Sequence, residues 1–512
     1  MNHDPHEPGT NLRGLGRARR ASYNITVITL TTLLWCQLPA AASDRPPSCD
    51  NNRTHFDADV RHHGHRDPRY HATAFSPWLR SDRFLLDALQ RNLAAGRQAG
   101  PILEAMAAKD REAVNRELAA LGTGHTHNEQ ALDACRESEV AAWAEALEQD
   151  TERRAQVNAA SIPDAYRSWQ RALGGYLFAR PFLRQGAQNW RLEEHRLQRD
   201  TSAPDPRLRW QPPPGPEWDE GAVARRLAAA REAHPLGWPW PEAAIREQLA
   251  AQFAPTIESP SDAHADRIGR LYGYRGRPRV DTDAPTAYVE AGLTRLGDEV
   301  LLQISYAFWF PERTATGPLD PYAGPIDGLI WRVTLDSSGR PLLWDSIHTC
   351  GCYYTLVLPQ DAPIEFRNPD PVAQEDPLVL IGPAATARMR IMASAGDHFL
   401  RWPREGATGV AEQGAETLNY QLRPYAELLA PGPRRPPFRS NGLLSGTSRL
   451  ERLFLFPAGI PDPGAMRTNG HHATAFLGRR HFDDPELAGG MIRMAPSALP
   501  GWKEGARTEP RD

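Results

Sequence analysis

The spacing of apolar residues changes once along the chain, from a period of three to four residues to a period of two. Between residues 81 and 255, apolar side chains recur three and four positions apart, which is typical of amphipathic helices. From about Tyr288 onward they alternate with other side chains, as in strands with one buried face. Helices first and strands later predict an α+β fold, with the strands forming a sandwich or a partly closed barrel.

The helical region contains several segments with a recognisable start or end. Ser81 precedes a stripe of leucines and is a suitable N-cap. Pro101 opens a second segment, which Gly122 ends, and Asn128 precedes a third. A fourth helix is expected to begin at Pro163.

A proline-rich break divides this region. Six prolines between residues 203 and 216 are expected to exclude regular structure. Shorter helical patterns follow, one from Gly221 and one over residues 245–249. Between them, Trp238-Pro239-Trp240-Pro241 is either a recognition surface or, as we expect, a linker packed against its own domain.

The alternating pattern is longest over residues 300–310, which predicts a long, half-buried strand. Gly297-Asp298 predicts a tight hairpin with residues 288–296. A second hairpin is expected over residues 329–347. Shorter strands are expected at residues 353–358, 378–381, 388–393 and 453–456.

The length and charge of the chain limit its class. A chain of 512 residues is long enough for one large or two ordinary domains. The formal net charge of −4 provides no broad basic surface, so nucleic acid is not an expected partner.

The N-terminus is typical of an export signal. A basic segment over residues 13–20 precedes an apolar core from Ile25 to Leu38, and small residues then predict cleavage after Ala42. The alternative is an uncleaved membrane anchor, but the core is shorter than the ~20 residues that span a bilayer. We therefore expect a periplasmic or secreted protein with no transmembrane segment after signal cleavage.

Export would place the remaining cysteines in an oxidising compartment. Without Cys36 in the signal, four cysteines remain, and three pairings are possible. The simplest is a Cys49–Cys135 disulfide, with Cys350 and Cys352 bound to each other or to a metal ion.

These patterns predict a signal peptide over residues 1–42, a histidine-rich lead-in over 43–80, a helical region over 81–255, a β-rich domain over 256–500 and a tail over 501–512. The histidines of the lead-in are His55, His62, His63, His65 and His71. Such clusters bind divalent metals when their rings converge, but a solvated, partly disordered arm is the expectation for His62, His63 and His65. His125-Thr126-His127 lies in a connection and is expected to be an exposed loop.

Reactive side chains are concentrated around the end of the second predicted hairpin, at His348, Cys350 and Cys352. In an extended strand, neighbouring members of this set are about 6.6 Å apart, too far to share one tetrahedral ion. Glycine tolerates unusual backbone angles, so a bend at Gly351 would bring the two sulfurs together, on a metal or in a disulfide.

Two distant histidines, His472 and His481, are candidates to complete a metal site. A set of nitrogen and sulfur ligands suits zinc or copper rather than magnesium or calcium. Asp483 or Asp484 would orient an imidazole from behind, although residues 479–484 are equally expected to form a surface ion-pair network. No phosphate-binding glycine motif occurs, so a nucleotide cofactor is not expected.

Two side chains are candidates for catalysis without a metal. Cys352 would act as a nucleophile if a base removed its proton. Glu312, at the end of the most hydrophobic strand, would act as a general base if desolvated, whereas a salt bridge with Arg313 or solvent exposure would make it structural. Asp327 and Asp345 are candidates of the same kind.

The Gly351-Cys352 pair loosely resembles the cysteine segment of the L,D-transpeptidases. Thr349 stands where that family has a serine, and Tyr354 stands where it has an arginine. The resemblance spans some four residues, and no residue role is carried over from it.

Three functions follow from these candidates. The first is an exported zinc- or copper-dependent hydrolase, whose metal ion is held by His348, one or both thiols, and His472 or His481, and polarises a water for hydrolysis. The second is a non-catalytic envelope or binding protein with a structural Cys350–Cys352 disulfide and a small-molecule, glycan or protein ligand. The third is an enzyme with Cys352 as its nucleophile.

Overall fold

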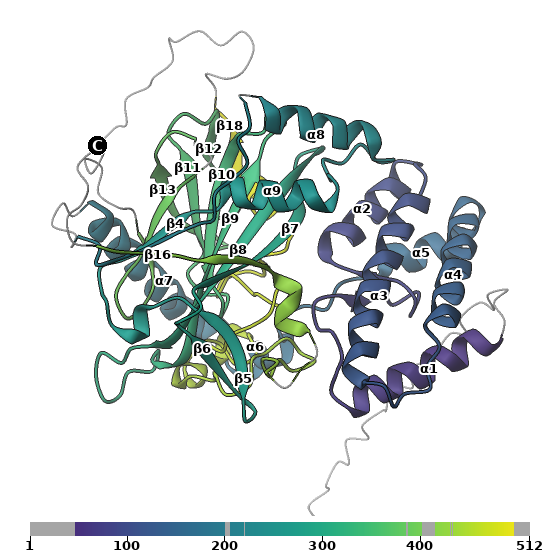
Figure 1. The fold of residues 1–512 in the computed structure, drawn as a ribbon, viewed down its shortest axis with the longest axis horizontal. Coiled ribbons are helices and arrows are strands. Elements are labelled where there is room, and N and C mark those ends of the chain that lie inside the picture. Colours follow the sequence, from purple (N-terminus) through teal and green to yellow (C-terminus); the bar gives the residue numbers. More distant parts are fainter. Residues whose placement is uncertain are drawn as a thin grey trace, which may run out of the picture. The chain divides into compact units, whose positions relative to one another are not determined.

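The computed structural model describes residues 47–199, 205–219, 221–385, 388–401, 415–430, 432 and 434–495. Within them a helical region precedes a strand-rich region, which confirms the predicted α+β class (Figure 1). The predicted signal peptide and the C-terminal tail lie outside the described residues. None of the described helices combines the length and apolar character needed to cross a membrane.

The N-terminal helices begin and end largely where local signals predict. They are α1 (Pro47–His62), α2 (Arg83–Ala94), α3 (Gly100–Leu121), α4 (Glu129–Gln149) and α5 (Thr151–Ala159), with the short strands β1 (His71–Ala72) and β2 (Arg80–Ser81) before α2. Gly122 follows α3 with φ 78°, and the Asn128 side chain caps α4 by accepting a hydrogen bond from the Ala131 N–H. The cap of α2 is Asp82, not Ser81, because its carboxylate accepts from the Leu85 N–H.

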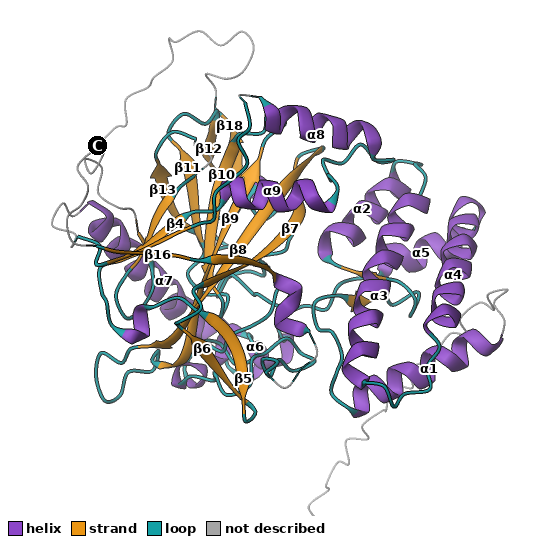
Figure 2. Cartoon of the chain, viewed as in Figure 1, coloured by secondary structure: helices purple, strands orange, loops and turns teal. Residues whose placement is uncertain are grey.

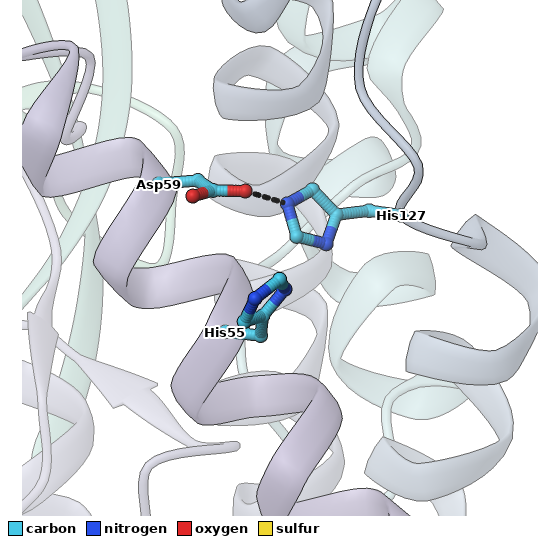
Figure 3. Close-up of side chains that lie close together, drawn as sticks. All are labelled: His55, Asp59 and His127. Carbon is cyan, nitrogen blue, oxygen red and sulfur yellow. Dashed lines mark hydrogen bonds and ion pairs between the residues drawn. The ribbon is translucent and has the colours of Figure 1, made fainter.

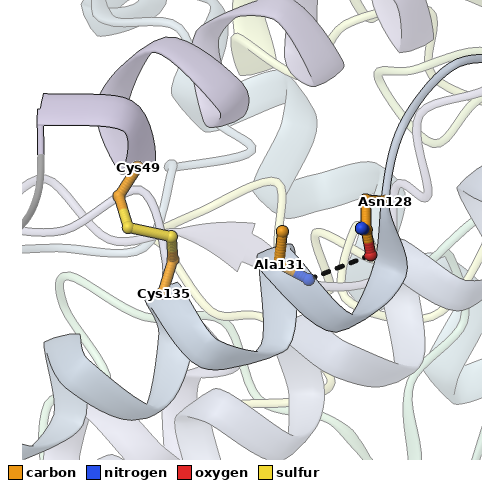
Figure 4. Close-up of a disulfide and its surroundings, with 4 residues drawn as sticks. All are labelled: Cys49, Asn128, Ala131 and Cys135. Atoms are coloured by element: carbon orange, nitrogen blue, oxygen red, sulfur yellow. Dashed lines mark hydrogen bonds between the residues drawn. A yellow bond between two sulfur atoms is a disulfide. The ribbon is translucent and has the colours of Figure 1, made fainter.

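The histidine-rich segment forms a packed helix over much of its length, and not only a solvated arm. Phe56 and Val60 of α1 are fully buried against α3 and α4. The predicted Cys49–Cys135 disulfide is present and joins α1 to α4, with the two Cα atoms 5.6 Å apart (Figure 4). This covalent link fixes the start of α1 on the helical region.

Two helices follow that the sequence pattern described poorly. The helix expected from Pro163 begins later, as α6 (Ser168–Leu173), and the long α7 (Tyr176–Arg199) was not predicted. Three apolar residues of α7, Leu177, Phe178 and Phe182, are each at least 80% accessible. Because apolar residues lie on both faces of α7, no single buried stripe marks it.

The proline-rich break contains a strand, which corrects the expectation of irregular structure there. The strand β3 (Leu208–Gln211) contains no proline. It pairs with β4 (Thr256–Ser259) and with β16 (Glu416–Asn419). The prolines flank this strand and do not interrupt its hydrogen bonds. Between β3 and β4 lie α8 (Ala222–Ala233) and α9 (Ala243–Phe253).

Among the described residues, seven strands form a central sheet in the order β13-β11-β10-β9-β8-β7-β17 (Figure 2). Their bounds are β7 Thr286–Leu296, β8 Glu299–Arg313, β9 Gly324–Leu335, β10 Pro341–His348, β11 Thr355–Pro359, β13 Leu378–Gly382 and β17 Gln421–Pro424. The predicted hairpin at Gly297-Asp298 joins β7 to β8, and β9 pairs with β10 as expected. A second sheet has the order β15-β14-β4-β3-β16, with β14 Arg390–Ala393 and β15 Leu400–Arg401.

Both faces of the central sheet are covered. On one face, Phe308 and Trp331 share a core with Trp210 and Ile257 of the second sheet, as in a sandwich. On the other face, Trp309 and its neighbours pack against segments from the C-terminal quarter of the chain. Strand β8 is therefore buried on both sides, whereas the alternation alone predicted a half-buried strand.

The remaining elements are short. They comprise the strand pairs β5 (Arg270–Tyr274) with β6 (Arg277–Asp281) and β12 (Ile364–Phe366) with β18 (Ile492–Met494), and the 3₁₀ turns η1 (His264–Asp266), η2 (Tyr425–Leu429), η3 (Leu450–Leu453), η4 (Phe456–Ala458) and η5 (Gly489–Met491). The strand expected at 453–456 is therefore wrong, because these residues belong to η3, η4 and the turn between them.

Candidate functional site

Cys350 and Cys352, the free cysteines of the described part of the chain, lie on a tight turn between β10 and β11. Strand β10 ends at His348, whose N–H donates to the Cys352 carbonyl at 3.1 Å, and the Gly351 N–H donates to the His348 carbonyl at 2.7 Å. Gly351 has φ 91°, and a Cβ at this position would lie 2.5 Å from the Ala473 carbonyl oxygen. The turn therefore requires glycine, and the bend predicted at Gly351 is confirmed.

Both thiols of this turn are buried and close to each other. Cys350 is 3% exposed and Cys352 is 9% exposed, and neither is in a disulfide. A hydrogen bond from Cys352 lowers the pKa of Cys350, and the same contact raises the pKa of Cys352. The pair therefore gives up a first proton more readily than a second.

Three arginines surround the thiol pair. The Arg467 Nε donates to the Cys350 carbonyl at 3.0 Å, and the Arg449 Nη2 donates to the Ile326 carbonyl at 2.9 Å. Arg313 is also buried, and its positive charge lies within electrostatic range of Cys350. These cations favour a thiolate in a site from which water is largely excluded.

A buried acid–imidazole network lies beside the arginines, centred on Asp327. His398 Nδ1 lies 2.9 Å from Asp327 Oδ2, and its Nε2 lies 3.2 Å from Asp266 Oδ1. Burial alone would lower the pKa of His398, but hydrogen bonds to these two carboxylates outweigh it and raise that pKa. His348 Nδ1 lies 3.7 Å from Asp327 Oδ1, too far for a hydrogen bond, and burial lowers its pKa.

Strained backbone is concentrated at the same place. Within the described residues, five non-glycine residues have positive φ, and three of them belong to or adjoin this network: Ile326 at 60°, Tyr353 at 63° and His398 at 56°. Such conformations cost about 1–3 kcal/mol each and persist where the surrounding structure enforces them, often at functional sites. Their clustering distinguishes this region from an ordinary core.

The thiol turn borders a cavity of about 590 Å³. Cys352 and Tyr353 form part of its wall, together with Arg313 and the carboxylate of Glu451. Most of the remaining lining is aromatic or apolar and includes Trp190, Tyr322, Phe182, Phe399, Phe454 and Phe476. The volume and the lining suit an apolar, drug-sized small molecule.

Glu451 is a buried acid of this cavity. It is 3% exposed, and burial raises its pKa to about 7, although Arg449 and Arg313 act in the opposite direction. Gly464 makes room for this carboxylate, since a Cβ there would lie 1.9 Å from Glu451 Oε1. A carboxyl with such a pKa exchanges protons near neutral pH.

A second cavity, of about 440 Å³, lies between the N-terminal helices and the central sheet. Lys109 and Glu112 of α3, Gln303 of β8 and the imidazole of His472 line it. His472 is 1% exposed, and burial lowers its pKa to about 3. Trp238 also lines this cavity and stacks edge-on against Phe84, so the Trp-Pro segment packs on its own chain as expected.

The structure brings together only part of the predicted metal set. His348 and the two thiols share one turn. His472 lies against the Thr349 backbone of this turn and also lines the second cavity. His481 Nε2 accepts from the Ala165 N–H at 3.1 Å and lies 3.2 Å from Asp164. Among the described residues, no three ligand atoms of the predicted set lie within 4.8 Å of one another.

The other predicted acids have structural surroundings. Glu312 is exposed near the end of β8. Asp345 is fully buried, with the Arg332 Nε donating to it at 2.8 Å and the Tyr354 hydroxyl donating at 3.0 Å. Asp483 forms an ion pair with Arg83 at 3.2 Å.

The sequence did not indicate His398, Arg449 or Glu451, because none of them belongs to a recognisable motif. The non-glycine residues with positive φ carry no signature in the sequence either. No protein-family model, curated protein or solved structure matches this chain.

Proposed function

We propose that this chain is an exported thiol–disulfide redox protein, in which Cys350 and Cys352 exchange two electrons with an apolar small molecule bound in the 590 Å³ cavity. The observation that carries the proposal is the pairing of two buried free thiols, one of which forms part of the cavity wall. A single nucleophilic cysteine would have no need for a second thiol within hydrogen-bonding range.

The proposed reaction is a thiol–disulfide exchange in two steps. The Cys352 thiolate attacks one sulfur of a small disulfide, forming a mixed disulfide and releasing one thiolate. The Cys350 thiolate then attacks Cys352 Sγ, closing the Cys350–Cys352 disulfide and releasing the second thiolate. The two released thiolates take up the two protons that the cysteines lose.

The groups around the thiols suit each step of this reaction. A proton that crosses the Cys352–Cys350 hydrogen bond moves the negative charge to Cys352, the cysteine that lines the cavity. Arg449 and Arg467 stabilise the charge on the pair. Glu451 is placed to take up and return protons, because it lines the same cavity and titrates near neutral pH.

The metal-dependent hydrolase is less favoured by this arrangement. Of the two distant imidazoles, His481 is engaged by Ala165 and Asp164, and His472 lines the other cavity. A metal shared by His348, both thiols and either of these histidines would require them to move. The aromatic cavity wall also suits an apolar ligand better than a polar hydrolytic substrate.

Metal analysis and thiol counting on native, reduced protein separate these functions. We expect no zinc or copper whose binding depends on Cys350 or Cys352, and two thiols that convert reversibly to one intramolecular disulfide in a glutathione redox titration. The Cys350→Ala and Cys352→Ala variants should each abolish this conversion, while the Cys49–Cys135 disulfide persists in both. Stoichiometric metal that is lost in Cys350→Ala would instead support the hydrolase, and a pair that cannot be oxidised would overturn the proposal.

A further inference from the structure

Two histidine-containing segments that are far apart in sequence meet at the surface of the helical region. His55 and Asp59 lie one turn apart on α1, so their side chains share one face of the helix. His127 comes from the connection between α3 and α4, and its Nε2 lies 2.8 Å from Asp59 Oδ2. One ligand atom from each residue lies within 4.8 Å of the other two (Figure 3). This is the size of group that a single metal ion can join.

The scaffold holds these three residues together without a metal. The Cys49–Cys135 disulfide links α1 to α4, six residues before His55 and eight residues after His127. Asn128, next to His127, is fixed as the cap of α4. The buried Phe56 ring lies edge-on to the His127 ring, with centroids 5.3 Å apart. The donors are therefore largely pre-organised, which lowers the entropic cost of binding an ion.

A fourth donor is close by. The His125 ring stacks on the His127 ring, with centroids 5.7 Å apart. Its Nδ1 is buried and has no hydrogen-bond partner among the described residues. An unpaired buried nitrogen is costly, and coordination is one way to satisfy it.

We propose that His55, Asp59 and His127 bind one divalent transition-metal ion of the zinc class, with His125 as an additional donor, and that the ion clamps α1 to the connection before α4. Imidazole and carboxylate ligands suit zinc and its first-row neighbours, whereas magnesium and calcium prefer oxygen-only sets. His55 is exposed to solvent, so one side of the site remains open to water or to an exogenous ligand.

The site lies on the helical region and uses none of the residues proposed for thiol chemistry, so the two proposals stand or fall separately. It also differs from the metal set predicted at His348 and the thiols. The sequence showed both histidine groups, but nothing in their spacing indicated that they meet.

Zinc titration of chelator-treated protein by calorimetry, with the disulfide intact, tests this site. We expect one tight zinc ion per chain, and about a tenfold or greater loss of affinity in His55→Ala and in Asp59→Asn. His55 is exposed and Asp59→Asn keeps the side-chain shape, so both variants should fold. A cobalt-substituted sample should show the ligand-field absorption of a protein-bound ion, and His127→Ala should remove it.

The matched control is a His62→Ala, His63→Ala double variant, which removes two exposed histidines at the end of the same helix. It should bind zinc as the wild type does. Zinc affinity that is unchanged in His55→Ala, or that falls only in the control, would overturn the proposal and assign binding to the exposed histidines.

Discussion

The raised pKa of Glu451 makes a quantitative prediction about stability. The pKa of an ordinary glutamate is 4.5, whereas the pKa of Glu451 in the folded chain is about 7. The native state thus binds the proton more tightly than the unfolded state, so the stabilisation that this proton provides is full below pH 4.5 and is lost as the pH rises to 7. At 1.36 kcal/mol per pKa unit, the loss amounts to about 3 kcal/mol.

The Glu451→Gln variant removes this titration and keeps the side-chain shape. Urea unfolding, followed by tryptophan fluorescence between pH 4.5 and 8, gives the free energy of unfolding for both proteins. The difference between wild type and variant should change by about 3 kcal/mol over this range, in favour of the variant at high pH. Other titrating groups cancel in the difference.

Glu365→Gln provides the matched control. Its carboxylate is 45% exposed and pairs with Arg493 at 3.1 Å. This variant should follow the pH dependence of the wild type. If Glu451→Gln also followed the wild type to within about 0.5 kcal/mol, a typical limit of additivity, the assignment of Glu451 as a proton carrier in the cavity would be refuted.

Three further predictions concern the scaffold. Asp110→Asn should destabilise the fold by about 3–5 kcal/mol in urea unfolding, because Asp110 is the buried partner of Arg53, Arg80 and Arg136; a loss below about 1 kcal/mol would contradict the importance of this network. Gly351→Ala should lower the free energy of unfolding, measured by thermal unfolding, by about 2 kcal/mol or more, because Gly351 has positive φ and lies close to the Ala473 carbonyl. Gly317→Ala should have little effect on stability, because the space around Gly317 is open. Replacing Cys49 and Cys135 by alanine removes a disulfide that spans 86 positions, and it should lower the free energy of unfolding by about 2–5 kcal/mol. The same replacement should weaken zinc binding at His55. Equal stability with and without the disulfide would contradict its proposed role in fixing α1.

Local signals predicted the local structure well. Gly122 and Asn128 delimit helices because the conformations they favour depend mainly on their immediate neighbours. The Gly297-Asp298 turn and the alternation around it determined the β7–β8 hairpin in the same way. The predictions of secondary structure failed where tertiary contacts determine it. One example is β3, which forms a strand because β4 and β16 flank it.

The candidate site was predicted only in part for a related reason. The two thiols and the bend at Gly351 are neighbours in sequence, so their proximity could be foreseen. Asp327 and His398 are 71 positions apart and meet only because the first residues of β9 lie beside the connection between β14 and β15. The segment of His472 contacts the turn, but among the described residues His472 forms no group of three ligand atoms within 4.8 Å with the others of the predicted set.

The most direct test of the thiol chemistry is the reaction of native protein with 4,4′-dithiodipyridine, a small aromatic disulfide that suits the cavity. Wild type should release two thiopyridones per chain and keep no adduct, because Cys350 displaces the second one. Cys350→Ala should release one and retain a pyridyl adduct on Cys352, located by peptide mapping. An adduct that remains on both cysteines of the wild type, or two thiols that do not react until the protein is unfolded, would contradict a cavity-facing redox pair.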